Sequence, residues 1–295
     1  MIIISRRSFL EGASALFAGA YLLPVGENTL LGQLPASDAS GVHKSFISFR
    51  IGVPQWLDEG RFQGLLDLFT KNKGLADEIT FFTSETHPPL PLEVIQERAG
   101  ILSQRMRAAR ALGYRSGVNI LSTLGHHNEN LDHSLNADYT RMTDIAGGVC
   151  QGSFCPNGEG MRGYIAAIYK AVTLAEPDYI WVDDDVRDSQ RGVTYACFCP
   201  VCLGKFGHGD DRAALVQRLN QPAEAELRRA WGEFNAATIE SVCRDIGDAV
   251  RAVDPAIELG LMTIGSSHST YAGHSVDRWM AALGAVRGRP GHGFY

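Results

Sequence analysis

From Ser45 onward, short runs of β-branched and aromatic residues alternate with longer stretches whose apolar residues recur at helical spacing. The short runs are typical of buried strands, and the longer stretches are typical of amphipathic helices. The pattern predicts strands at 46–53, 78–83, 117–123, 179–182 and 257–263, with the start of a sixth at 293–295. It predicts helices at 62–69, 92–112, 164–175, 224–253 and 279–286.

This alternation of strands and helices predicts an α/β fold with a parallel sheet, which can be a doubly wound sheet or a (β/α)8 TIM-type barrel. Two features favour the barrel: the repeat is regular, and polar residues follow the predicted strands, where a barrel gathers its catalytic loops. No G-x-G-x-x-G follows the first strand, which argues against a dinucleotide-binding sheet. Because a closed barrel has eight strands, we expect residues 41–295 to be its N-terminal part, truncated after about five to six β/α units.

Three carboxylates and an arginine follow the fourth predicted strand: Asp183, Asp184, Asp185 and Arg187. If the strand continued, Asp183 and Asp185 would share one face and Asp184 the other. Hydrolysis of a glycosidic bond needs two carboxyl groups, one of them a protonated acid, and a cluster of acids raises the pKa of at least one member. Arg187 could hold another member ionised. The alternatives are a site for a divalent cation or structural ion pairing.

A second cluster follows within one loop, where Cys197, Cys199 and Cys202 form C-x-C-x-x-C. Tetrahedral Zn²⁺ needs a fourth ligand, and Cys155 on the loop after the third predicted strand can supply it. Cys150 is a competing fourth ligand. A site with four protein ligands is closed, so we expect a structural zinc with no organic cofactor; disulfides are the alternative.

Other polar or aromatic residues after strands are candidates for binding a substrate. His126 follows the third predicted strand, Glu85 follows the second, and Trp56 follows the first. His126 and Glu85 could form hydrogen bonds to a sugar, and Trp56 could stack on a sugar face. The alternatives are solvated loops for the two polar residues and a packed aromatic for Trp56.

The strand-end acids followed by C-x-C-x-x-C, with one more cysteine upstream, resemble the barrel domain of the family 42 β-galactosidases. The resemblance implies that Asp185 takes the place of the acid/base Glu, one methylene shorter. Asp184 takes the place of an Asn that contacts the sugar, and Asp183 takes the place of an Asp at the same strand end. We expect Asp184 to act with Asp185 in catalysis, and Asp183 and Arg187 to bind the substrate. It also implies that the nucleophile lies on a later strand beyond Tyr295, and that one structural zinc is held by Cys155, Cys197, Cys199 and Cys202. The pairing of Trp-x-Asp-Asp-Asp-x-Arg with Cys-x-Cys-x-x-Cys also resembles a looser set of exported, glycosyl-hydrolase-like barrel proteins.

The first 40 residues resemble a twin-arginine export signal followed by a linker. Arg6 and Arg7 precede Phe9-Leu10 and an apolar run at 13–23. The alternative is a membrane anchor, but this run is about half of the roughly 20 residues that a membrane span needs. We therefore expect export to the periplasm or the cell exterior, with no membrane attachment once the signal is removed.

The chain carries a net charge of -6 and shows no basic face, which excludes a typical nucleic-acid binder. The sequence thus predicts an exported glycoside hydrolase acting on O-glycosidic bonds of oligosaccharides or polysaccharides through paired carboxylates. One alternative is a barrel that binds carbohydrate without hydrolysing it. The other is a metal-dependent hydrolase that uses Asp183 to Asp185 together with His126.

Overall fold

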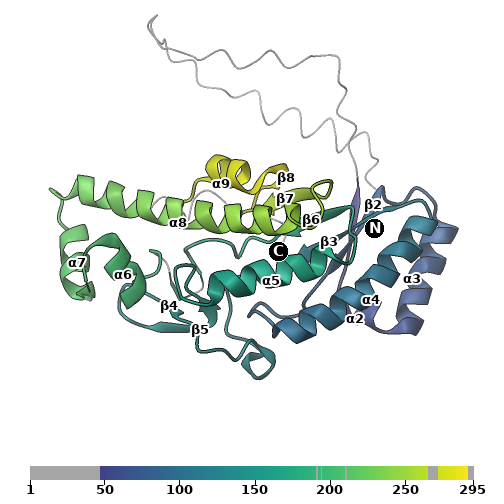
Figure 1. Ribbon diagram of the computed structural model, residues 1–295, viewed down its shortest axis with the longest axis horizontal. Coiled ribbons are helices and arrows are strands. Elements are labelled where there is room, and N and C mark those ends of the chain that lie inside the picture. Colours follow the sequence, from purple (N-terminus) through teal and green to yellow (C-terminus); the bar gives the residue numbers. More distant parts are fainter. Residues whose placement is uncertain (1–46, 191, 194, 210, 265–271, 292–295) are drawn as a thin grey trace, which may run out of the picture. The chain divides into compact units, whose positions relative to one another are not determined.

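The computed structural model describes residues 47–190, 192–193, 195–209, 211–264 and 272–291 (Figure 1). The predicted signal and linker at 1–40 and the predicted strand at 293–295 lie outside the described residues. Both therefore stay predictions. None of the helices in the described part of the chain is both long and apolar enough to cross a membrane.

Six parallel strands form the main sheet, in the order β1-β2-β3-β6-β7-β8. The spatial order follows the chain without reversal, whereas a doubly wound sheet reverses its order at a switch point. The α/β fold of barrel type is therefore confirmed, as six consecutive strands of a barrel. The strands are β1 (Ser48–Ile51), β2 (Glu78–Phe82), β3 (Arg115–Ile120), β6 (Tyr179–Val182), β7 (Glu258–Met262) and β8 (Ala285–Arg289).

The long helices pack on one face of this sheet, and Figure 1 shows α4, α5 and α8 running across it. Phe81, Val118, Ile180 and Leu259 lie in register on that face and share one continuous core with the helices. Helices on a single face are the arrangement of a barrel, in which the other face lines the lumen. The helices of this layer are α3 (Glu59–Lys71), α4 (Leu92–Ala111), α5 (Met161–Thr173), α8 (Ala225–Arg251) and α9 (Val276–Leu283).

The opposite face of the sheet, here called the inner face, carries a separate small cluster of Tyr179, Trp181 and Met262. Two glycines make room for its rings, because a Cβ on Gly117 would lie 2.3 Å from the Tyr179 ring and one on Gly260 would lie 2.4 Å from the Trp181 ring. Charged residues also lie on this face. It therefore has the mixed polar and aromatic character of a binding surface rather than of an apolar core.

The C-terminal part departs from the predicted pattern. A helix was expected to reach residue 286 with a strand beginning at 293, but α9 ends at Leu283 and β8 already spans Ala285–Arg289. Gly284 ends the helix in the left-handed conformation (φ +73°) that glycine adopts without strain. Strand β8 escaped prediction because Arg287 and Arg289 interrupt its apolar pattern.

The long loops after β3 and β6 contain small elements that the periodicity did not predict. The loop after β3 holds the 3-10 turn η1 (Leu131–His133) and an antiparallel hairpin, which then leads into α5. These elements shape the carboxyl end of the sheet. They comprise β4 (Arg141–Thr143), β5 (Val149–Phe154), α6 (Pro200–Phe206) and α7 (Arg212–Leu219). A further short helix, α2 (Val53–Leu57), follows β1.

Candidate functional site

Asp183 lies at the carboxyl end of β6 and joins three strands of the sheet through its carboxylate. Its Oδ2 accepts a hydrogen bond from Asn119 Nδ2 of β3 at 2.8 Å, and Arg50 of β1 approaches the same oxygen to 3.8 Å. The side chain is only 7% exposed. Burial, and then the charge of Asp184, raises the pKa of the Asp183 carboxyl, although these hydrogen bonds oppose the shift. A carboxyl group with a raised pKa at this end of the sheet can serve as a proton donor.

Asp184 is half-buried and paired with two arginines. Its Oδ1 lies 2.8 Å from Arg187 Nη1, and its Oδ2 lies 3.5 Å from Arg289 of β8. Arg187 also donates from Nε to the Ser189 carbonyl at 2.6 Å. Arg187 thus holds Asp184 and the following loop in place, which fixes the position of the carboxylate beside Asp183.

Asp185 is fully buried and fastens the loop that follows β3. Its Oδ2 accepts hydrogen bonds from the backbone N–H groups of Thr123 at 2.6 Å, Leu124 at 2.8 Å and Gly125 at 2.7 Å. Burial raises the pKa of Asp185 to about 8, against the opposing effect of these donors. We call this set of three hydrogen bonds the Asp185 clamp.

The Asp185 clamp corrects the prediction that Asp185 is the acid/base. A carboxyl group with no exposed surface, directed into a backbone loop, does not face a substrate. The prediction failed because it extended the alternation of β6 beyond Val182, where the strand ends. The chain turns there, with the Arg187 N–H donating to the Asp185 carbonyl at 2.9 Å, and this turn directs the Asp185 side chain toward β3.

Two other residues predicted to bind a substrate, Trp56 and Glu85, form contacts within the protein instead. Trp56 lies in α2 with no exposed surface and donates from Nε1 to the Phe82 carbonyl at 2.9 Å, so the expectation that it stacks on a sugar is corrected to a core role. Glu85 is exposed and forms a two-point ion pair with Arg98 of α4, at 2.6 and 3.0 Å. Burial raises the pKa of Glu85, but the hydrogen bonds from Arg98, a backbone hydrogen bond and the charges of Arg98 and His133 together lower it.

His126 lies at the carboxyl end of the sheet and is buried rather than solvated, and its neighbours are other histidines. Its ring centroid lies 4.3 Å from that of His87 and 4.8 Å from that of His127. Of these three histidines, only His126 was predicted to bind a substrate. The signal for His87 was its position after β2, because the loops after neighbouring parallel strands meet at one end of a sheet.

The four predicted zinc ligands, Cys155, Cys197, Cys199 and Cys202, converge in the structure. Their sulfur atoms are buried and all lie within 4.8 Å of one another, with Cys155 Sγ 3.4 Å from Cys202 Sγ and 3.5 Å from Cys199 Sγ. Four sulfurs bound to one Zn²⁺ at about 2.3 Å would lie about 3.8 Å apart, so the thiols fit a tetrahedral ion. All six cysteines are among the described residues, and none forms a disulfide.

The structure also distinguishes between the two possible fourth ligands. Cys150 is directed toward the Asn128 and Ser153 side chains, at 3.4 and 3.3 Å, and is not part of the four-cysteine cluster. The hydrogen bonds among these thiols, that with Cys155 first, lower the pKa of Cys199, whereas the pKa values of Cys155 and Cys202 are raised. The cluster without a metal therefore favours one thiolate surrounded by protonated thiols. A zinc ion here would join the hairpin after β3 to the loop after β6.

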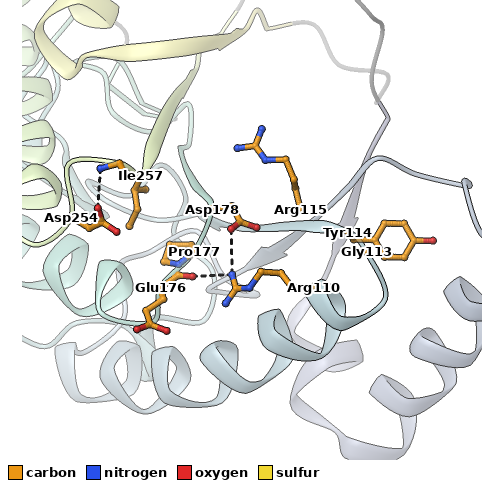
Figure 2. A pocket seen from close by; sticks show the side chains of 10 residues that line it. Arg110, Gly113, Tyr114, Arg115, Glu176, Pro177, Asp178, Asp254 and Ile257 are labelled. Atoms are coloured by element: carbon orange, nitrogen blue, oxygen red, sulfur yellow. Dashed lines mark hydrogen bonds and ion pairs between the residues drawn. The ribbon is translucent and has the colours of Figure 1, made fainter.

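A pocket of about 660 Å³ lies at the other end of the sheet, near the amino ends of β3, β6 and β7 (Figure 2). Arg110 donates to the Glu176 carbonyl at 2.9 Å and pairs with Asp178 at 3.6 Å. Figure 2 shows these interactions along its wall. In barrels this end contributes stability and the opposite end carries the chemistry, so the candidate site remains with the acids after β6.

No known protein-family profile matches the chain, and no curated protein matches it. Solved structures do resemble it. A β-galactosidase from Rahnella sp. R3 gives a TM-score of 0.56 at 12% identity, over 81% of this chain and 38% of that protein. A β-galactosidase from Marinomonas ef1 gives 0.53 at 11% identity, over 81% and 40%. The catalytic domain of a β-amylase from Paenibacillus polymyxa gives 0.51 at 14% identity, over 80% and 73%.

At these identities the likeness shows the fold alone. The chain spans 38% and 40% of the length of the two β-galactosidases and 73% of the β-amylase domain. Its six strands and their helix layer therefore have the fold of part of a TIM-type barrel.

Proposed function

We propose that this chain is the barrel portion of an exported glycoside hydrolase that cleaves O-glycosidic bonds of oligosaccharides or polysaccharides. The observation that carries the proposal is the pair Asp183 and Asp184 at the carboxyl end of β6. Asp183 lies on the inner face of a barrel-type sheet and Asp184 lies beside it. Most glycosidases use a general acid and a second carboxyl group across the glycosidic bond, and Asp183 would supply the first of these.

In this proposal Asp183 protonates the leaving oxygen of the glycoside. Its raised pKa suits a general acid, and Arg50 beside it, with a side chain 35% exposed, offers a hydrogen-bond donor for a sugar hydroxyl. Asn119 is fully buried and holds the Asp183 carboxylate in place. Asp184 and Arg187 orient the substrate. The resemblance to family 42 assigns the nucleophile to a later strand than the six described here.

The proposal includes two features of the whole protein. A zinc ion bound by the four-cysteine cluster stabilises the loops around Asp183. A twin-arginine signal at the N-terminus directs the folded protein to the periplasm or the cell exterior. Neither feature takes part in the chemistry.

A specific observation favours a second candidate function, carbohydrate binding without hydrolysis. None of the three acids after β6 is exposed: Asp183 is held by Asn119, Asp184 is paired with two arginines, and Asp185 forms the clamp. Such a surface can bind sugar hydroxyls without donating a proton to them.

The experiment is a hydrolysis assay of the complete purified protein with nitrophenyl glycosides and a panel of plant and algal oligosaccharides. We expect turnover that Asp183→Asn lowers by about 10²-fold or more. Asp67→Asn, which alters an exposed aspartate on α3, should leave the rate unchanged. Binding of oligosaccharides without any turnover would favour the second function, and a protein that neither binds nor cleaves them would reject both.

A further inference from the structure

Three imidazoles meet at the carboxyl end of the sheet, on the loops after β2 and β3. The rings of His87 and His127 are stacked, with centroids 4.3 Å apart and an angle of 23° between their planes. The His126 ring meets both of them edge to face. One nitrogen from each ring can be chosen so that all three lie within 4.8 Å of one another. The three histidines are called the His cluster below.

Glu129 contacts the Nδ1 atoms of two of these rings. Its Oε1 forms a hydrogen bond with His87 Nδ1 and accepts the His87 backbone N–H at 3.1 Å, and its Oε2 lies 3.4 Å from His127 Nδ1. A carboxylate in this position keeps the proton on Nδ1 and leaves the Nε2 lone pair available. Histidines that bind metals almost always have such a partner.

The loop that carries His126 and His127 is fixed from two sides. The Asp185 clamp holds the backbone N–H groups of the three residues that precede His126. Strand β5 supports the other side, where Asn128 Oδ1 accepts the Gly152 N–H at 2.8 Å. A Cβ on Gly152 would lie 1.6 Å from the His127 carbonyl oxygen, so only glycine allows this approach.

The second loop is tied to the first. The Ser122 hydroxyl donates to the His87 carbonyl, and the Leu135 N–H donates to the Pro89 carbonyl at 2.6 Å. The backbones that carry the three imidazoles are thus set before any ligand arrives. Such preorganisation is what a metal site requires of its surroundings.

We propose that the His cluster binds one divalent transition-metal ion of the zinc class, with Glu129 holding two of its ligands in place. Imidazole is a preferred ligand of such ions, and a site with three protein ligands keeps a coordination position open for water or substrate. Two nitrogens bound to one Zn²⁺ at about 2.1 Å are at most about 4.2 Å apart. Binding would therefore require the partly exposed rings of His87 and His127 to rotate from the separations of up to 4.8 Å found here.

This site differs from the four-cysteine cluster in its ligands and in its open position, and it does not depend on the proposed function. It also differs from a metal site at the acids after β6. There, Asp183 and Asp184 are engaged with Asn119 and with arginines, whereas the His cluster lies on the loops after β2 and β3.

The test compares zinc bound per chain in the wild type, His87→Ala and His127→Ala after each is equilibrated with Zn²⁺ and freed of loose metal. Because every variant keeps its cysteines, the four-cysteine cluster contributes equally, and we expect both variants to hold one ion fewer than the wild type. His133→Ala is the matched control, since His133 lies exposed on the same loop outside the cluster, and it should bind as the wild type does. His87 and His127 are partly exposed, with side chains 35% and 21% accessible, so their replacement should leave the fold intact.

Calorimetric titration with Zn²⁺ gives the second readout. We expect the affinity for this ion to fall at least 100-fold in His127→Ala and 10- to 100-fold in Glu129→Gln. Co²⁺ bound in place of Zn²⁺ should give visible absorption bands that disappear in His127→Ala while the thiolate charge-transfer bands remain. Equal zinc content in the wild type and both histidine variants, or an equal loss in His133→Ala, would overturn the proposal.

Discussion

The Asp185 clamp leads to a stability prediction that separates a positioning carboxyl group from a reacting one. Asp185→Ala removes the acceptor of three buried N–H groups, those of Thr123, Leu124 and Gly125. A buried donor left without an acceptor costs about 1–3 kcal/mol. With partial relaxation of the loop, we expect the free energy of unfolding to fall by about 3–5 kcal/mol.

Asp185→Asn should be much milder, because the amide oxygen can still accept the three hydrogen bonds. With a pKa of about 8, the carboxyl group is mostly neutral at pH 7, and an amide resembles it in size and charge. We expect a loss of about 1 kcal/mol. The order of stability, wild type above Asn and Asn well above Ala, is the signature of the clamp.

The same pKa fixes the sign of the pH dependence. Because the pKa of Asp185 is raised from its ordinary 3.8 to about 8 in the folded protein, the folded state binds more protons than the unfolded state between these values. The contribution of Asp185 to stability is therefore full below about pH 4 and is lost as the pH rises to 8, at no more than about 1.4 kcal/mol per pH unit. The Asn side chain does not titrate, so the stability of Asp185→Asn does not change with pH for this reason. The difference in the free energy of unfolding between the wild type and Asp185→Asn should therefore shrink between pH 5.5 and 7.5.

Urea unfolding followed by circular dichroism, at pH 5.5 and 7.5, measures all three proteins under the same conditions. The reasoning is refuted if Asp185→Ala lies within 1 kcal/mol of the wild type, or if Asn destabilises the protein as much as Ala does. A deficit of Asn that stays constant between pH 5.5 and 7.5 would show that the carboxyl group is already charged inside the clamp.

Three further predictions concern other parts of the structure. Elemental analysis of gently purified protein should find a zinc ion that is absent from Cys199→Ser. Once the metal is removed, alkylation followed by mass spectrometry should find free thiols at 155, 197, 199 and 202. Disulfides at these positions would contradict the zinc site. Trp56→Ala should lower the free energy of unfolding by about 3–5 kcal/mol without changing the affinity for oligosaccharides. A loss of affinity without a loss of stability would show instead that Trp56 contacts the sugar. Gly117→Ala should destabilise the protein by about 1–3 kcal/mol in thermal unfolding because its Cβ would overlap the Tyr179 ring, and an unchanged melting temperature would show that the ring has room to move.

Much of the fold could be predicted because its signals are local. The run from Tyr179 to Val182 is apolar and ends at charged residues, and the structure places β6 at those same residues. Strand β8 could not be predicted in the same way, because two arginines face the inner side of the sheet and only Ala285 and Val286 are apolar. A strand at the sheet edge with a polar face lacks the periodicity on which the prediction rests.

The site was predictable in its parts and not in its geometry. The spacing of the cysteines led to four sulfurs that do converge. The role of Asp185 could not be read from spacing, because it depends on a turn that directs the side chain toward three N–H groups on another strand's loop. The partnership of His87 with His126 was hidden for a similar reason, since it joins two loops that only the sheet brings together.

The central claim is that Asp183 donates a proton at the carboxyl end of β6, and the most direct test is the dependence of Asp183→Asn on the leaving group. The rates of the complete protein are compared for a natural disaccharide and for the dinitrophenyl glycoside of the same sugar, whose leaving group needs no protonation. We expect the variant to lose about 10²-fold or more on the disaccharide and far less on the dinitrophenyl glycoside. Equal losses on both substrates, or a selective loss in Asp185→Asn instead, would contradict the account.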